Sequence, residues 1–172
     1  MKFGINKKRK NPPDRRVVFT PEELVRLQSE HPEAEIKVES SDIRIFSDDQ
    51  YRNLGLNVTA EMSDCDVLFG VKEVPVDALI PNKKYFFFSH TIKKQPYNRK
   101  LLKAILDKNI ELYDHETIVD ATNHRLIGFG RYAGLVGAYN GFRGFGIKYD
   151  LFTLPKAETL SGKEDLIARL KR

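Results

Sequence analysis

Two almost uninterrupted apolar runs most constrain the fold of this chain. Asp66–Lys72 and Lys84–His90 are rich in Val, Leu and Phe, and each ends in an ionisable side chain. Apolar runs of about four to eight residues bounded by turn residues are typical of strands buried on both faces of a parallel sheet. Because ligands bind where the carboxyl ends of parallel strands meet, we expect Lys72 and His90 to lie together at that edge.

The remaining segments alternate between strand and helix patterns. Thr20 precedes Pro21 and two acidic residues, which together predict the start of a helix. The alternation indicates a flavodoxin-like, doubly wound α/β fold with a mainly parallel sheet. Further strands are expected at Lys2–Asn6, Glu35–Glu39, Asn57–Glu61 and Ile110–Asp114. Helices are expected at Asp48–Leu54, Arg99–Lys108 and Asp165–Lys171, the last of them opened by a capping box at Ser161–Glu164. A hairpin is expected with arms Thr117–Val119 and Arg125–Phe129.

Glycines mark the last third of the chain. A long helix is predicted over Arg131–Tyr149, yet five glycines lie in it or at its start, inside a sector of roughly 80°. Each costs about 1 kcal/mol relative to alanine, so we expect close packing against another helix to compensate. This predicts an interdomain contact or a homodimer; the alternative is that the glycines form loops. The five are Gly130, Gly134, Gly137, Gly141 and Gly144.

The basic charge of the chain is local. The net charge is +5, but residues 1–16 alone carry +6, because seven basic side chains face a single acid, Asp14. A nucleic-acid interface would need clustered basic residues with aromatic platforms or a reading helix, whereas this segment contains Pro12 and Pro13. We therefore expect an anionic small molecule and no nucleic acid as partner.

Apolar and cysteine content predict a cytoplasmic protein without membrane contact. No apolar run approaches the ~20 residues of a membrane span, and no secretory h-region is present. The single cysteine, Cys65, excludes a disulfide framework and suits a reducing compartment. No zinc-binding or phosphate-loop motif occurs, so no metal site is predicted. Gly128–Gly134 nearly matches a dinucleotide fingerprint, but its last glycine is one residue late and no βαβ unit follows, so no cofactor-binding residue is predicted.

Lys72 and His90 are the first candidates for chemistry. A lone His at a strand end is often a hydrogen-bonded core residue, and a lone Lys there usually reaches solvent. Their joint occurrence beside a third strand that ends in Asp114 and Glu116 favours a proton-transfer pair, since imidazole titrates near neutrality. The planar guanidinium of Arg16 suits a carboxylate, although a solvated loop arginine is the alternative.

Five stretches together resemble one family. They resemble the N-terminal domain shared by alanine dehydrogenases, proton-translocating transhydrogenases and lysine-forming saccharopine dehydrogenases. The resemblance covers residues 1–150, and the run around His90 is most similar to the saccharopine dehydrogenase, or lysine-ketoglutarate reductase, branch. The stretches are Gly4-Ile5, Asp14–Val17 with Thr20-Pro21, Gly70–Pro75, Phe86–Asn98 and Phe129–Gly134.

This resemblance implies a two-domain oxidoreductase of amino-acid and lysine metabolism. One domain binds NAD or NADP and the other contributes most catalytic groups. The resemblance implies that Lys72 and His90 are the acid–base pair and that Arg16 holds a substrate carboxylate. An alanine dehydrogenase-like domain and a non-enzymatic module that binds small acids or another protein are the alternatives. Further substrate positions are implied at Glu73, Lys93, Gln95, Glu116 and Arg125.

The chain departs from this family at two places. The family usually has an acidic residue near Lys8, where this chain is basic. In the family a nucleotide-binding domain should follow this region, whereas the given chain ends at Arg172. We therefore expect a substrate and catalytic domain over residues 1–130, a connecting helix over 131–150 and a tail over 151–172 that leads toward a missing NAD(P)-binding domain. Alone, such a chain would bind an amino acid or keto acid but would be inactive.

Overall fold

The computed structural model describes residues 1–9 and 13–171 in two compact units, Met1–Ile127 and Gly128–Arg172. Lys10 and Pro12 of the basic N-terminal segment lie outside the described residues.

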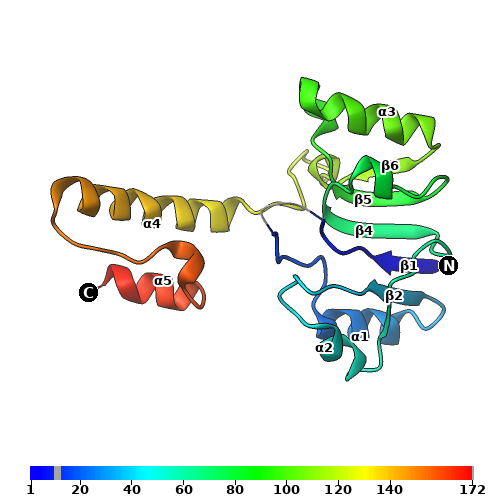
Figure 1. The fold of residues 1–172 in the computed structure, drawn as a ribbon, viewed down its shortest axis with the longest axis horizontal. Coiled ribbons are helices and arrows are strands. Elements are labelled where there is room, and N and C mark those ends of the chain that lie inside the picture. Colours follow the sequence, from blue (N-terminus) through cyan, green and yellow to red (C-terminus); the bar gives the residue numbers. More distant parts are fainter. Residues whose placement is uncertain (10–12, 172) are drawn as a thin grey trace. The chain divides into compact units, whose positions relative to one another are not determined.

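The first unit is built on a six-stranded, all-parallel sheet (Figure 1). The strand order is β3-β2-β1-β4-β5-β6. The chain thus places β2 and β3 on one side of β1 and then crosses to the other side with β4. This is the six-stranded, Rossmann-type doubly wound order, and it becomes the flavodoxin order when the short edge strand β3 is left out. The predicted doubly wound α/β fold is confirmed. The strands are β1 Lys2–Ile5, β2 Glu35–Glu39, β3 Asn57–Thr59, β4 Val67–Lys72, β5 Lys84–Phe88 and β6 Glu111–Asp114.

Helices cover both faces because alternate residues of each strand point to opposite sides. Leu68 belongs to a core with α3, whereas its neighbour Phe69 packs against a second core that includes residues of α1 and α2. Thr20 caps α1 at the predicted helix start, and it does so through a reciprocal capping box with Glu23. The helices are α1 Pro21–Glu30, α2 Asp48–Arg52 and α3 Arg99–Asp107, with 3₁₀ turns at Val76–Ala78, Thr91–Lys93, Pro96–Asn98 and His115–Thr117.

One local prediction holds only in part, and another is wrong. The hairpin after β6 forms as a single antiparallel bridge, Val119 with Arg125, rather than as two extended arms. In its turn, Asp120 Oδ1 accepts bonds from the amides of Thr122 and His124. The predicted Ser161–Glu164 capping box does not form. Gly162 is the N-cap of α5 and makes no side-chain cap bond, while the hydroxyl and amide of Ser161 bond to Asp165.

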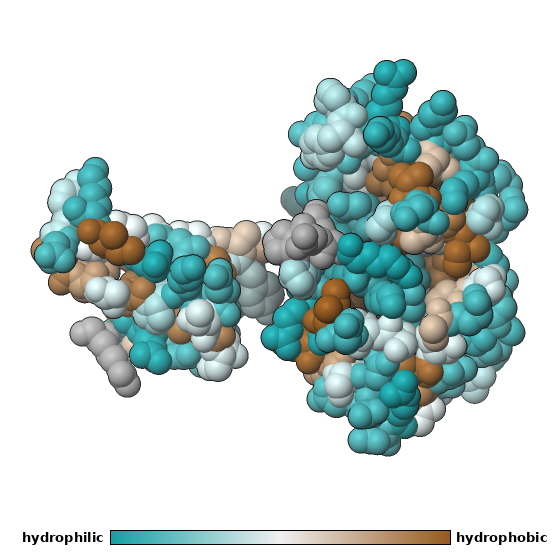
Figure 2. Space-filling model, in the orientation of Figure 1, coloured by the Kyte–Doolittle hydropathy of each residue, from teal (hydrophilic) through white to brown (hydrophobic). Residues whose placement is uncertain are grey.

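The second unit contains α4, Gly130–Tyr149, α5, Lys163–Leu170, and a 3₁₀ turn at Ala157–Thr159. The buried Tyr139 of α4 donates to the carbonyl of Pro155, which ties the returning chain to the helix. Gly146 is needed for this packing, because a Cβ there would lie 2.5 Å from the Phe152 carbonyl oxygen. A Cβ at any of the five predicted stripe glycines would instead meet open space, and hydrophobic side chains reach the surface of this unit (Figure 2).

Within residues 1–9 and 13–171, none of the helices combines the length and the apolar character that crossing a membrane requires.

Candidate active site

The structure brings Lys72 and His90 together. Lys72 is the last residue of β4 and His90 lies two residues beyond the end of β5, so neighbouring strands deliver both to the same edge of the sheet. The distance from Lys72 Nζ to His90 Nε2 is 3.1 Å. A register shift in the pairing of β4 with β5, between Phe69 and Lys72, lies directly before this contact. Irregularities of this kind re-aim side chains at strand ends.

Glu116 holds the other nitrogen of the same imidazole. Its Oε2 lies 2.9 Å from His90 Nδ1, and the Glu116 side chain is only 12% exposed. A carboxylate accepts, so Nδ1 carries the proton and donates to it. The lone pair of Nε2 is therefore directed at Lys72, whose ammonium donates. The three side chains form one hydrogen-bonded line, Lys72–His90–Glu116, along which a proton can move.

Two further predicted residues converge on Glu116. Lys93 Nζ lies 3.1 Å and an Arg125 guanidinium nitrogen 3.4 Å from Glu116 Oε1. The hydrogen bond from His90 lowers the pKa of Glu116, and Lys93 lowers it further against the opposing effect of burial. Glu116 is therefore ionised at neutral pH and accepts the Nδ1 proton of His90.

An aromatic ring forms the floor of this cluster. The Phe88 ring lies 5.7 Å from Lys72 Nζ and 5.9 Å from the Arg125 guanidinium carbon, and its centroid lies 6.1 Å from that of His90. A ring face attracts cations and excludes water from one side of them. Phe88 thus groups two cations and the imidazole without competing for their hydrogen bonds.

Arg16 belongs to a second charged group after β1. Asp14 accepts bonds from two guanidinium nitrogens of Arg16, at 3.0 and 2.7 Å, and lies 2.6 Å from Lys8 Nζ. Burial alone would raise the pKa of Asp14, but these bonds outweigh it and hold the pKa well below its ordinary value. Burial is the main reason why the pKa of Lys8 is lowered to about 8. The charges of Arg16 and Lys72 act in the same direction, and Asp14 opposes them.

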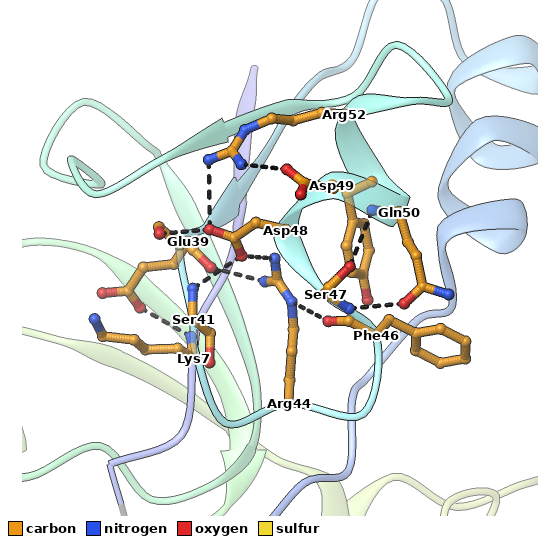
Figure 3. Close-up of polar contacts among 12 residues, drawn as sticks. Lys7, Glu39, Ser41, Arg44, Phe46, Ser47, Asp48, Asp49, Gln50 and Arg52 are labelled. Carbon is orange, nitrogen blue, oxygen red and sulfur yellow. Dashed lines mark hydrogen bonds and ion pairs between the residues drawn. The ribbon is translucent and has the colours of Figure 1, made fainter.

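A buried polar network supports the segment that carries Arg16. Arg44 donates to the carbonyls of Phe46 and Glu39 and pairs with Asp48, and its guanidinium lies 4.3 Å from the centre of the Tyr51 ring (Figure 3). The loop held in this way reaches the arginine segment through the Ile45 amide, which donates to the Arg15 carbonyl at 2.9 Å. The position of Arg16 therefore depends on the loop after β2.

The other predicted residues are placed differently. Gln95 is exposed, and its amide oxygen accepts a bond from Tyr97 rather than from the Lys72–His90–Glu116 line. Glu73 directly follows Lys72 and is half-buried. The sequence reasoning assigned no role in the site to Asp14, Ser89 or His115. Asp14 carried a signal, since an acid two residues before Arg16 can fold back onto it, but the contacts of Ser89 and His115 depend on tertiary pairing.

His90 has a left-handed backbone conformation, with φ of 57°. Such a conformation is unfavourable for a residue with a Cβ and persists only where the surroundings impose it. The turn is held by the side-chain amide of Asn98 and the backbone amide of Lys93, which both donate to the His90 carbonyl, at 3.2 and 3.1 Å.

Neither a metal ion nor a dinucleotide finds a site in the described part of the chain. Residues 1–9 and 13–171 contain no group of three or more His, Cys, Asp or Glu side chains that could hold a metal. Gly128–Gly134 runs from a loop into α4 and follows no regular strand, so it is not the strand–turn–helix that cradles a pyrophosphate. This stretch therefore does not provide the glycine-rich turn that a nicotinamide nucleotide needs.

Sequence comparison shows that this chain is similar to enzymes of known activity. The alpha-aminoadipic semialdehyde synthase of Arabidopsis thaliana is 35% identical over 147 residues, which are 83% of this chain and 14% of that protein. The L-lysine-forming NAD(+) saccharopine dehydrogenase of Yarrowia lipolytica is 27% identical over 80% of this chain and 40% of that enzyme. The chain thus spans well under half of either relative.

Solved structures and a family match agree with the fold. An L-alanine dehydrogenase structure is similar with a TM-score of 0.60 and 19% identity, covering 87% of this chain and 41% of that one. Residues 4–136 match the family described as "Alanine dehydrogenase/PNT, N-terminal domain", a range that contains every predicted site residue. The chain therefore belongs to the alanine dehydrogenase/PNT N-terminal domain family.

Proposed function

We propose that this chain is the substrate-binding and catalytic half of an NAD(P)-dependent amino-acid dehydrogenase, most similar to saccharopine dehydrogenase. The observation that carries the proposal is the Lys72–His90–Glu116 line, in which an ammonium, an imidazole and a carboxylate are joined by bonds of 3.1 and 2.9 Å. Three ionisable groups in series at the carboxyl edge of a parallel sheet are suited to proton transfer beside a bound substrate.

In this proposal Lys72 and His90 move protons to and from the reacting amine and carbonyl of the substrate. The imidazole holds its proton on Nδ1 against Glu116, so Nε2 is free to exchange a proton with Lys72. The Lys72 ammonium can then donate to a carbonyl oxygen, or its neutral amine can take a proton from an attacking amine or water. Such assistance contributes typically 10²–10⁴-fold to a rate.

Cations beside this line would orient the carboxylates of an amino acid and a keto acid. Arg16 is already held by Asp14 in a fixed direction, which reduces the entropy lost when it binds a carboxylate. Lys93 and Arg125 offer positive charge on the Glu116 side. Glu73 and Gln95 are proposed as outer substrate contacts, with neither nucleic acid nor a membrane as partner.

The redox cofactor is proposed to bind a nucleotide domain outside this chain. NAD or NADP bound there would supply hydride transfer. Because the described residues do not fit a dinucleotide, the chain alone should bind substrate acids without turning them over.

Two measurements test this proposal. In the complete polypeptide that the gene encodes, Lys72→Met and His90→Gln should each lower turnover about 10²-fold or more, since each removes one group of the proton path. Unchanged turnover in either variant would remove that residue from the mechanism. In the 172-residue chain, NMR titration with a dicarboxylic keto acid should shift signals around Arg16, and Arg16→Met should abolish the shift.

The same experiments distinguish the alternatives. Substrate binding without turnover in the complete polypeptide would favour a non-enzymatic module that binds small acids. Turnover by the 172-residue chain with added NAD or NADP would contradict the proposed need for a second domain. Preference for pyruvate and alanine over larger acids would favour an alanine dehydrogenase-like enzyme.

A further inference from the structure

Asp114, the last residue of β6, is a buried carboxylate without an assigned role. It is 6% exposed. Its Oδ2 accepts a bond from the Ser89 hydroxyl, and its Oδ1 accepts from the Glu116 amide at 2.9 Å. Both partners lie next to groups of the proposed proton path, since Ser89 precedes His90 and Glu116 accepts the His90 Nδ1 proton.

Ser89 links Asp114 to the turn that contains His90. It is 1% exposed, so its hydroxyl must satisfy its bonds within the protein. While it donates to Asp114, its Oγ accepts from the Thr91 amide at 3.1 Å and lies 2.8 Å from the Thr91 hydroxyl. These bonds fix the residues on either side of His90, which is the residue with the left-handed backbone.

One carboxylate therefore fixes both ends of the His90–Glu116 hydrogen bond. We propose that Asp114 is a positioning residue that sets the tautomer of His90, acting on the imidazole through Ser89 and on Glu116 through its amide. Without this anchor, the left-handed turn at His90 would relax and Nδ1 would lose its fixed acceptor. The proton would then be shared between the two ring nitrogens, and Nε2 would no longer be reserved for Lys72. The catalytic consequence rests on the function proposed above, but the tautomer does not.

The first experiment is two-bond ¹H–¹⁵N NMR of the histidine rings in the 172-residue chain at pH 8. His90→Gln assigns the signals. The unaltered chain should show His90 with its proton on Nδ1, and Ser89→Ala and Asp114→Asn should each give the averaged signals of mixed tautomers. A His90 ring with unchanged Nδ1–H signals in both folded variants would overturn the proposal, as would an Nε2–H ring in the unaltered chain.

Ser40→Ala is a matched control. Asp48 accepts bonds from the Ser40 hydroxyl and, at 3.0 Å, from the Ser41 amide, so it too joins a serine hydroxyl and a backbone amide after a strand. Removing the Ser40 hydroxyl should leave the His90 signals unchanged. A change as large as that in Ser89→Ala would show general loosening instead and would count against a positioning role.

A measurement without substitution covers the case in which a variant does not fold. The amides of Thr91 and Glu116 should be protected from hydrogen exchange together in the unaltered chain, because both donate to the Asp114–Ser89 pair. Exchange as fast as in an exposed loop would overturn the proposal. In the complete polypeptide, Ser89→Ala should lower kcat about 10-fold with little change in KM, because binding groups are untouched. Suppose that Ser89→Ala and Asp114→Asn give mixed tautomers, but that turnover of the complete polypeptide survives Lys72→Met. The proposed function would then fail, while Asp114 would still position His90.

Discussion

Asp14 explains how this chain can keep a lysine, Lys8, in a buried position. Lys8 is 6% exposed and its ammonium would be costly to bury alone, yet Asp14 lies 2.6 Å away and is shared with Arg16. The carboxylate thus neutralises one buried cation and directs another. The sequence shows the three charges, but it does not show that one acid serves both bases, because that depends on how the chain folds back after β1.

At this scale we predict that Asp14→Asn destabilises the fold and weakens carboxylate binding. The substitution removes the carboxylate that Lys8 and Arg16 share, and it should lower the free energy of unfolding at pH 7 by about 1–3 kcal/mol. The pKa of Asp14 is depressed in the fold, so its contribution is present above the ordinary value of 3.8 and is lost as the pH falls below it. Urea unfolding at pH 7 and pH 3 measures both effects, and the difference between variant and parent should shrink at pH 3.

Glu22→Gln is the control for that substitution, because it removes an exposed acid from the first turn of α1. It should lower stability only by a few tenths of a kcal/mol. A loss in Asp14→Asn no larger than in this control would contradict a buried, shared carboxylate.

At the scale of elements, α4 has two kinds of glycine. Gly146 touches Phe152, whereas a Cβ at Gly137 or Gly141 would meet no atom within 4 Å. A helix gains about 1 kcal/mol for each exposed glycine replaced by alanine. The stripe therefore weakens an isolated α4, which is the physical reason to expect a partner on it.

We predict that Gly137→Leu with Gly141→Leu abolishes self-association or interdomain contact through α4. The larger side chains would hold another helix away from the close approach that the glycines permit. Sedimentation of the parent and the double variant measures the association. The assignment would be contradicted if both proteins sedimented as the same assembled species. Gly146→Ala should instead lower the thermal stability of the second unit.

At the scale of the whole molecule, His115 connects the site edge to the pH dependence of folding. Its imidazole is 5% exposed, lies near Phe86 and Phe88, and its Nε2 donates to the Gly70 carbonyl within the irregular end of β4. Burial lowers the pKa of His115 below 6.5, although the bond to Gly70 opposes the shift. The folded state therefore favours the neutral ring.

We predict that acid destabilises the fold through His115. Because its pKa is lowered on folding, the unfolded chain takes up the proton first, so its contribution is intact above about pH 6.5 and is lost as the pH falls below that value. The free energy of unfolding should fall less between pH 7.5 and pH 5.5 in His115→Gln than in the parent. His124→Gln, which alters an exposed ring, should leave that slope unchanged. Equal slopes in the parent and His115→Gln would show that His115 does not titrate on folding.

The sequence by itself determined the periodic parts of this protein. Short apolar runs such as Lys84–His90 favour strands, because a parallel sheet covered on both faces buries them, and α1 begins after Thr20 because a helix-start signal is local. The same rule placed Lys72 and His90 at one edge. Where neighbouring residues did not suffice, prediction failed, as at Ser161, whose hydroxyl bonds to Asp165 instead of forming a cap.

Only the tertiary structure decided how the site is held together. The bond from Ser89 to Asp114 joins residues 25 positions apart, and the bond from His115 to Gly70 joins residues 45 apart. A pattern along the chain records whether a residue is apolar or charged. It does not record which distant partner satisfies a buried polar group, because that depends on the register in which strands pair.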